Sequence, residues 1–107
     1  MDEATLDDLR AAHGEIYALE EHPDVIFRRP TAPQYKRFRA SVVSNDPRRL
    51  ANAAPDLCKD VVVHPTGKAY DEYMDRYPGL PDEIALQAQE LARGSLQARA
   101  KKLTSGS

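Results

Sequence analysis

The stretch EIYALEEHPDVIFRR, residues 15–29, decides the fold of this chain. Two apolar runs flank the turn-forming segment Glu21–Asp24, and this pattern predicts a strand, a turn and a second strand. Side chains alternate between the two faces of a strand, so every second residue lies on the same side. The residues predicted to share a face are Tyr17 and Leu19 on the first strand and Val25 and Phe27 on the second. Because an isolated hairpin is only marginally stable in water, we expect this one to pack against helices.

Apolar residues at helical spacing predict helices on both sides of the hairpin. Thr31 and the Asp46-Pro47 pair are residue types that cap and begin helices. Pro55 falls inside the next helix and predicts a kink or a break there, because its ring clashes with the carbonyl group four residues earlier. The β-branched run Val61–Val63 is expected to be extended. The predicted helices cover residues 4–13, 31–44, 46–60, 66–77 and 81–94.

A length of 107 residues fits a single domain. We expect that domain to cover residues 1–95 and to be of the α+β class, mostly helical, with one N-terminal β-hairpin packed against three to five helices. Residues 96–107 form a basic tail that is predicted to be helical at first and then disordered. The apolar stripes of the helices are predicted to be Tyr35, Phe38 and Val42, then Leu50, Ala53, Ala54, Leu57, Cys58 and Val61, and last Ile84, Ala88 and Leu91.

The composition argues against several classes of protein. Cys58 is the single cysteine, which excludes an intramolecular disulfide framework and a zinc site built from several cysteines. No apolar run approaches the roughly 18 residues of a membrane span, and the first ten residues are acidic where a signal peptide is basic. The five glycines are dispersed, so no glycine-rich loop is present to hold a phosphate. We therefore expect a soluble protein of a reducing compartment.

Charge is segregated along the chain into four blocks of alternating sign. The net charge of −2 arises by cancellation, because residues 1–24 carry −7, residues 25–49 carry +6, residues 50–90 carry −5 and residues 91–107 carry +4. A uniformly solvated surface does not require such blocks. The pattern favours electrostatic complementarity, either within the fold or between chains.

No set of side chains predicts catalysis. The three histidines, His13, His22 and His64, lack the spacing of metal ligands. Cys58 lies on an apolar helix stripe and is expected to be a buried, inert thiol. The carboxylates within Asp71–Asp75 alternate with core residues, as a solvated helix face does. We therefore predict no catalytic residue, no cofactor and no metal, and a protein that is not an enzyme.

Two regions are candidates for binding another protein. The first is the basic segment after the second strand, with Arg28, Arg29, Tyr35, Lys36 and Arg39 as candidate contacts and Arg37 among them. The chain as a whole is acidic, so an acidic protein face, for instance residues 71–83 of a sister subunit, is favoured over nucleic acid as its partner. The second region is the turn that contains Tyr77 and Leu80, which stand either in the core or in a partly exposed contact.

Several short motifs, in their order along the chain, resemble tail assembly chaperones of long-tailed bacteriophages and prophages. The resemblance spans about residues 10–95. The motifs are HGEIY at 13–17, VIFRRPT at 25–31, YKRF at 35–38, VVVHP at 61–65 and YPGL at 77–80, followed by a final helix rich in alanine and leucine. The acidic N-terminal segment and the basic tail do not match the family pattern.

The resemblance implies a small helper protein in the cytoplasm of the bacterial host. Such a protein binds the tape-measure protein, keeps its long apolar helices in solution and helps to recruit tail-tube subunits, and it is absent from the finished particle. The family has no catalytic residues. For this chain we also expect no cofactor and no membrane partner, and self-association stays open. Two alternatives are a minor structural protein of the virion, such as a connector, neck or tail component, and a small nucleic-acid-binding regulator that uses the basic segment.

Overall fold

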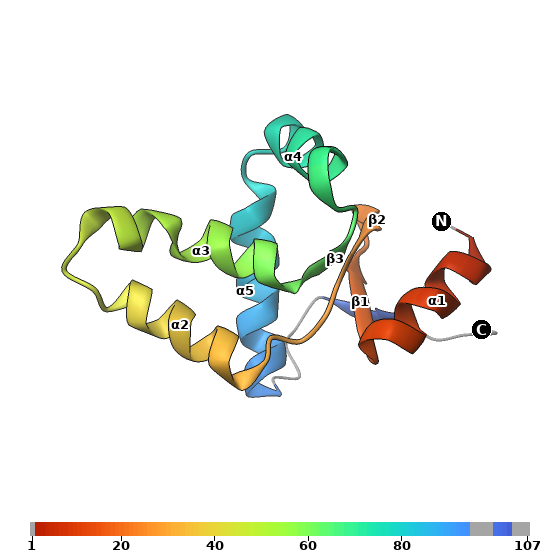
Figure 1. Cartoon of the computed structure of the whole chain (residues 1–107), viewed down its shortest axis with the longest axis horizontal. Helices are drawn as coiled ribbons and strands as arrows, with labels where there is room; N and C mark the ends of the chain where they lie inside the picture. Colours follow the sequence, from red (N-terminus) through yellow and green to blue (C-terminus); the bar gives the residue numbers. More distant parts are fainter. Residues whose placement is uncertain (1, 95–99, 104–107) are drawn as a thin grey trace.

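The fold is an antiparallel sheet that lies between one N-terminal helix and a group of four further helices (Figure 1). The computed structural model describes residues 2–94 and 100–103. Within these residues the elements are α1 (Glu3–His13), β1 (Ile16–Leu19), β2 (His22–Phe27), α2 (Ala32–Val42), α3 (Pro47–Val61), β3 (Val62–His64), α4 (Gly67–Arg76), α5 (Leu80–Arg93) and β4 (Lys101–Leu103). The architecture is α+β and mostly helical, as the sequence predicts. No helix among the described residues is long and apolar enough to cross a membrane.

The β1–β2 hairpin forms the centre of a sheet with the strand order β3-β2-β1-β4. Tyr17 pairs with Phe27 and Leu19 pairs with His22. The register shifts between these two pairs, so some residues of β2 have no partner on β1. The turn is therefore shorter and earlier than Glu21–Asp24, the segment that the sequence suggested, and Pro23 lies inside β2. The irregular register explains this difference, because a proline is tolerated in a strand where ladder hydrogen bonds are interrupted.

The two faces of the hairpin contribute to different hydrophobic clusters. Tyr17, Leu19, Val25 and Phe27 are all buried in the main core, which confirms the predicted alternation. The opposite face contributes a smaller cluster, and α1 covers it. That cluster consists of Ile16, Ala18 and Ile26, with Leu6 and Leu9 of α1, Val63 and Leu103 packed against it.

Helices α3 and α5 pack against each other and supply most of the remaining core. The predicted stripe of Ile84, Ala88 and Leu91 on α5 is buried, as is most of the predicted stripe on α3. Helix α3 continues through Pro55, so the predicted break does not occur. Pro55 and Ala51, whose carbonyl would otherwise accept the missing hydrogen bond, are both exposed, so water can satisfy that carbonyl.

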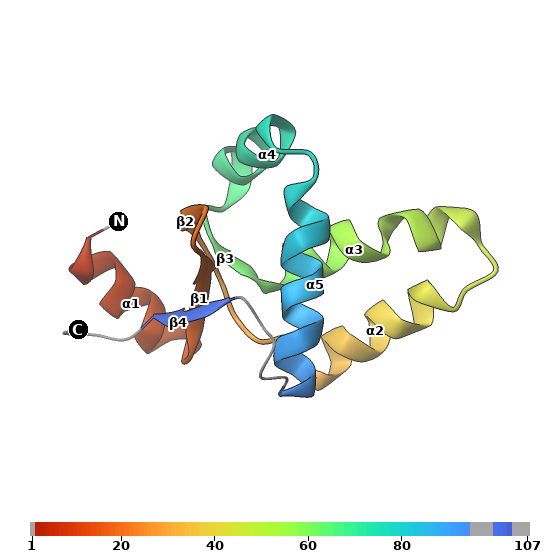
Figure 2. The ribbon, with the colours of Figure 1, turned by 180° about the vertical axis from the view of Figure 1, so that it is seen from behind.

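Helix α2 pairs with α3 in a helical hairpin that projects to one side of the molecule (Figures 1 and 2). No residue of α2 is buried. Val42 and Leu50, both expected in apolar core stripes, are 43% and 51% exposed, so this part of the prediction is wrong. The end of the hairpin extends beyond α5, and no other described element covers it (Figure 2).

The basic tail contributes a strand. Lys101–Leu103 forms β4, which pairs antiparallel with β1, so the predicted disorder is wrong for these three residues. The rest of the predicted tail, residues 95–99 and 104–107, lies outside the described part of the chain. Opposite charge holds β4 in place, since Lys102 Nζ lies 3.1 Å from Glu15 Oε1 and Lys101 Nζ lies 3.7 Å from Glu20 Oε2. The last charge block therefore meets the first one within the fold.

Candidate protein-binding site

Helix α2 lies between two hollows, and Phe38 lines both of them. One hollow, here called the polar cleft, opens between α2 and α3 and has a volume of about 200 Å³. The other, here called the apolar groove, is lined by residues of α2 and α5 and has a volume of about 220 Å³. Because α2 has hollows on both sides, it contacts the core through partly buried side chains such as Phe38.

The local sequence fixes where α2 begins and how it is oriented. Thr31 and Gln34 form a reciprocal capping box, in which each side chain bonds the backbone of the other residue. Just before the helix, the backbone N–H of Arg28 donates to the carbonyl oxygen of Val61 at the end of α3. These contacts anchor the first turn of α2.

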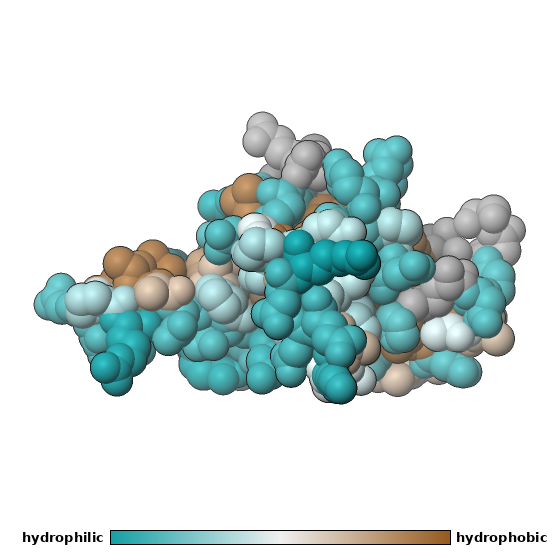
Figure 3. Space-filling view, turned by 90° about the horizontal axis from the view of Figure 1, so that it is seen from above, coloured by the Kyte–Doolittle hydropathy of each residue, from teal (hydrophilic) through white to brown (hydrophobic). Residues whose placement is uncertain are grey.

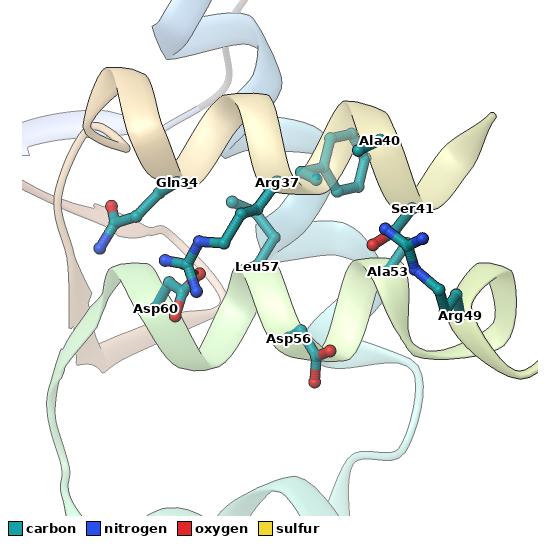
Figure 4. Close-up of a pocket in the computed structure, with 10 residues that line it drawn as sticks. Gln34, Arg37, Ala40, Ser41, Arg49, Ala53, Asp56, Leu57 and Asp60 are labelled. Atoms are coloured by element: carbon teal, nitrogen blue, oxygen red, sulfur yellow. Dashed lines mark hydrogen bonds and ion pairs between the residues drawn. The ribbon is translucent and has the colours of Figure 1, made fainter. Parts of the chain in front are cut away.

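The polar cleft holds charges of both signs (Figure 4). Arg37 of α2 points toward Asp60 of α3, with a distance of 3.4 Å between Nη2 and Oδ2. Arg49 and Asp56 line the cleft farther along α3. Because two guanidinium groups stand with two carboxylates, the cleft is balanced in charge. Its ion pair is best understood as a contact that holds the helical hairpin together.

The apolar groove has a different lining. It is formed by Tyr35, Phe38, Arg39, Val42 and Val43, with Gln89 contributed by α5. The rings of Tyr35 and Phe38 stack with their centroids 6.4 Å apart. The Gln89 amide donates to the carbonyl oxygen of Ala85 on its own helix at 3.2 Å, which keeps this polar side chain along α5. The groove therefore presents an aromatic and aliphatic wall with a single cation, Arg39, beside it.

The groove runs toward exposed hydrophobic residues at the end of the helical hairpin. Val43 is 75% exposed, and with Val42 and Leu50 it forms what we call the apolar tip. Figure 3 shows hydrophobic side chains gathered at the end of the molecule where α2 connects to α3. Isolated surface hydrophobics are common, but three large ones at one end beside a groove are typical of an interaction site.

The structure divides the basic segment that the sequence singled out. Tyr35 and Arg39 line the apolar groove, and Lys36 is exposed on the same helix. Arg29 lies instead near the sheet, where its Nη2 is 3.6 Å from Glu15 Oε2 and donates to the Tyr17 hydroxyl at 3.4 Å. Arg28 precedes α2 and is half-buried. The predicted single basic patch is thus two separate regions.

The second predicted region is also divided. Tyr77 is 40% exposed, whereas Leu80 is 5% exposed and belongs to the main core. Leu80 begins α5, and its backbone N–H donates to the carbonyl oxygen of Tyr77 at 2.9 Å. Leu80 is therefore mostly covered by the fold, whereas Tyr77 is the more accessible of the two predicted contact residues.

Sequence reasoning missed Val43, Leu50 and Gln89 as groove or tip residues. Val43 stands next to a turn-forming Ser-Asn-Asp-Pro run, which is a weak local signal for an exposed position. Leu50 has the spacing of a core residue, and Gln89 reaches the groove from a helix far away in sequence. Nothing local in the sequence identifies these two.

The described side chains that could bind a metal or act as a nucleophile do not form a reactive site. Among residues 2–94 and 100–103, no group of three or more histidine, cysteine, aspartate or glutamate side chains is arranged to hold a metal ion. Cys58 is buried, and burial raises the pKa of its thiol to about 11. Its Sγ accepts a hydrogen bond from the Tyr70 hydroxyl at 3.3 Å, and burial raises the pKa of that phenol as well. The thiol is thus protonated and covered.

One family model, a domain of unknown function named DUF6848, matches residues 9–101. The chain belongs to the DUF6848 family. The match contains α2, α3, α4, α5 and the first three strands completely, and it ends at the first residue of β4. No curated protein and no solved structure matches the chain. The helical hairpin and its apolar groove accordingly lie inside the family domain.

Proposed function

We propose that this protein is a non-enzymatic assembly helper that binds an apolar helix of a partner in the apolar groove. The observation that carries the proposal is the unpartnered surface of α2, in which Val42 and Val43 remain exposed beside a groove lined by Tyr35 and Phe38. A groove of this kind suits an amphipathic helix whose apolar residues fill it. Burial of one valine side chain alone is worth about 1.5 kcal/mol or more.

The charges around the groove indicate which helices would fit. Arg39 lines it, and Arg48 and Arg49 stand at the start of α3 near the apolar tip. These cations favour acidic residues next to the apolar face of the client helix. Charged rims change the rate and selectivity of association more than its strength, so the apolar contact supplies most of the affinity.

The identity of the proposed partner is taken from the resemblance to tail assembly chaperones. The client is the tape-measure protein of a long-tailed phage or prophage, whose long apolar helices need cover before the tail assembles. The same helper then assists in recruiting tail-tube subunits, acts in the cytoplasm of the bacterial host and is absent from the finished particle. The groove provides the contact that such a role requires, and it requires no catalysis.

Co-expression with the tape-measure protein encoded in the same genome tests the proposal. We expect the client to remain in the soluble fraction and to co-purify with the wild-type helper. Val43→Asp places a charge in the apolar surface and is expected to weaken binding at least tenfold, because it removes the apolar contact and requires a carboxylate to be desolvated. Ala12→Asp, which adds the same charge to exposed α1 at the other end of the molecule, is the matched control.

An insoluble client in the presence of the wild-type helper would contradict the proposal, as would equal binding by Val43→Asp. Mass spectrometry of purified particles separates a helper from a minor structural protein of the virion. We expect trace amounts or none, and stoichiometric peptides from this chain would favour the structural alternative.

A further inference from the structure

A third hollow, larger than the apolar groove, lies where the turn between α4 and α5 meets the β1–β2 turn. It has a volume of about 410 Å³ and is here called the corner pocket. Its floor contains the buried side chain of Leu80. Helix α4 lies next to the beginning of α5 in both ribbon views, whereas the start of α2 lies near the opposite end of α5 (Figures 1 and 2). The corner pocket is therefore distinct from the apolar groove.

An aromatic cluster forms one wall of the corner pocket. The ring of Tyr77 lies 4.9 Å from that of His22 and 5.1 Å from that of Tyr73, measured between centroids. A hydrogen bond of 2.7 Å between Nδ1 of His22 and the hydroxyl group of Tyr73 connects the hairpin to α4. Tyr77 remains 40% exposed, although its neighbours hold its ring in place. An exposed ring that is already fixed loses little conformational entropy when it binds a ligand.

The charged groups that line the corner pocket are mostly acidic. Glu21 from the hairpin turn and Glu83 from α5 contribute carboxylates, and Arg76 at the end of α4 contributes the opposing charge. Asp24 lies near enough to Tyr73 to help raise the pKa of its phenol, after the larger effect of burial. An aromatic face beside carboxylates attracts a cation through the ring quadrupole and through direct ion pairing.

We propose that the corner pocket binds the guanidinium group of an arginine side chain that a partner protein presents. The planar guanidinium would stack on the exposed face of Tyr77 and pair with the carboxylate of Glu21. Arginine is preferred over lysine because its flat, weakly hydrated head both stacks on a ring and bonds a carboxylate in a fork. This inference goes beyond the proposed function, since it uses other residues and another ligand.

Titration with short peptides, followed by the NMR signals of the Tyr77 and His22 rings, tests this proposal. The probe is acetyl-Gly-Gly-Arg-Gly-Gly-amide, for which we expect a Kd of roughly 1 mM, as suits a single side chain. The same peptide with citrulline, which has a similar shape and no charge, is expected to bind at least tenfold more weakly. Equal binding of the two peptides would overturn the proposal, and so would the absence of ring shifts at roughly ten times the expected Kd.

For four variants the proposal predicts whether the arginine peptide binds more weakly, equally well or more tightly than it binds the wild type. Tyr77→Ala is expected to weaken binding about fivefold, whereas Tyr77→Phe keeps the ring and the affinity. Glu21→Gln is expected to weaken binding, and Arg76→Gln to strengthen it, because it removes the one cation that lines the pocket. Glu72→Gln, on an exposed part of α4 and paired with Lys68, is the matched control. A loss of affinity in Arg76→Gln, or an unchanged affinity in Tyr77→Ala, would contradict the assignment.

Discussion

Phe27 connects the sheet to the helical core. It is fully buried, pairs in register with Tyr17 on one side and Val62 on the other, and its ring lies 6.4 Å from that of Tyr17. We expect Phe27→Ala to lower the free energy of unfolding by about 3–5 kcal/mol, because a large cavity would remain in the main core. Urea denaturation measures this change. Phe38→Ala, at a partly buried position on α2, should cost clearly less, and equal losses for the two variants would contradict the account.

Cys58 shows how burial controls the chemistry of one side chain. Because its pKa is raised to about 11, only about a thousandth of the thiol is ionised at pH 8, and that fraction is shielded from solvent. We therefore expect Ellman's reagent to react slowly with the folded protein and at once with the protein in urea. Rapid stoichiometric labelling without denaturant would show that the thiol is accessible.

At the residue scale, the sequence predicts burial well where a pattern is local. The alternation of Tyr17, Leu19, Val25 and Phe27 is enough to assign one face of the hairpin. Burial on a helix is harder to predict, because the stripe on α2 is apolar whether or not a neighbour covers it. Val42 has the spacing of a core residue and is exposed, since α5 does not extend over the end of α2.

Among the elements, β4 depends most on charge. Its Lys102 donates a hydrogen bond to Glu15, and this bond is the first cause of the lowered pKa of the Glu15 carboxyl, with the Tyr17 hydroxyl second and the charges of Lys102 and Arg29 adding to it. Because the pKa of the Glu15 carboxyl is lowered in the folded protein, its contacts stabilise the fold fully above the usual carboxyl pKa of 4.5. That stabilisation is lost as the pH falls through the lowered pKa. The pairing of β4 should therefore be constant near neutral pH and weaken in acid.

Hydrogen exchange of the β4 amides measures this effect as protection factors. We expect lower protection at pH 3 than at pH 6, and lower protection at pH 6 when roughly 0.5 M NaCl is added, since these ion pairs are exposed to salt. Glu15→Gln should already show the lower protection at pH 6 and respond less to acid. Protection factors that are the same in the wild type and in Glu15→Gln would contradict a role for this carboxylate.

The existence of β4 could not be predicted from its own three residues. Lys-Lys-Leu is typical of a basic tail, and its extended form depends on an edge of β1 that is more than eighty positions earlier in the chain. The alternating charge blocks favour electrostatic complementarity within the fold or between chains, but they do not specify which blocks meet. They carry no information about register, because the strand pairing is set by backbone hydrogen bonds.

At the scale of the whole molecule, the hydrophobic core and the proposed binding surface are located in different places. The core lies between the sheet, α3 and α5, whereas the apolar tip projects away from it. We expect Val43→Asp to change the free energy of unfolding by less than about 0.5 kcal/mol, as exposed substitutions usually do. Thermal unfolding measures this change. A large loss of stability would show that Val43 supports the fold, and its effect on client binding would then not locate a site.

The candidate site is also a property of the whole molecule. Tyr35 and Arg39 could be selected from the sequence because aromatic and basic residues stand out in a short helix. The groove itself forms only because α2 and α5 both pack on α3 without closing over each other. That arrangement depends on tertiary packing, which no local pattern records.

Site-specific photo-cross-linking is the most direct test of the proposal that the apolar groove and tip hold a helix of the tape-measure protein. Val43→Cys and Ala12→Cys proteins are each labelled with a cysteine-reactive photo-cross-linker, which the buried Cys58 does not take up. Each protein is then irradiated together with the client. We expect a covalent adduct with an apolar helix of the tape-measure protein from position 43 and little or none from position 12. No adduct from position 43, or equal yields from both positions, would contradict the proposal.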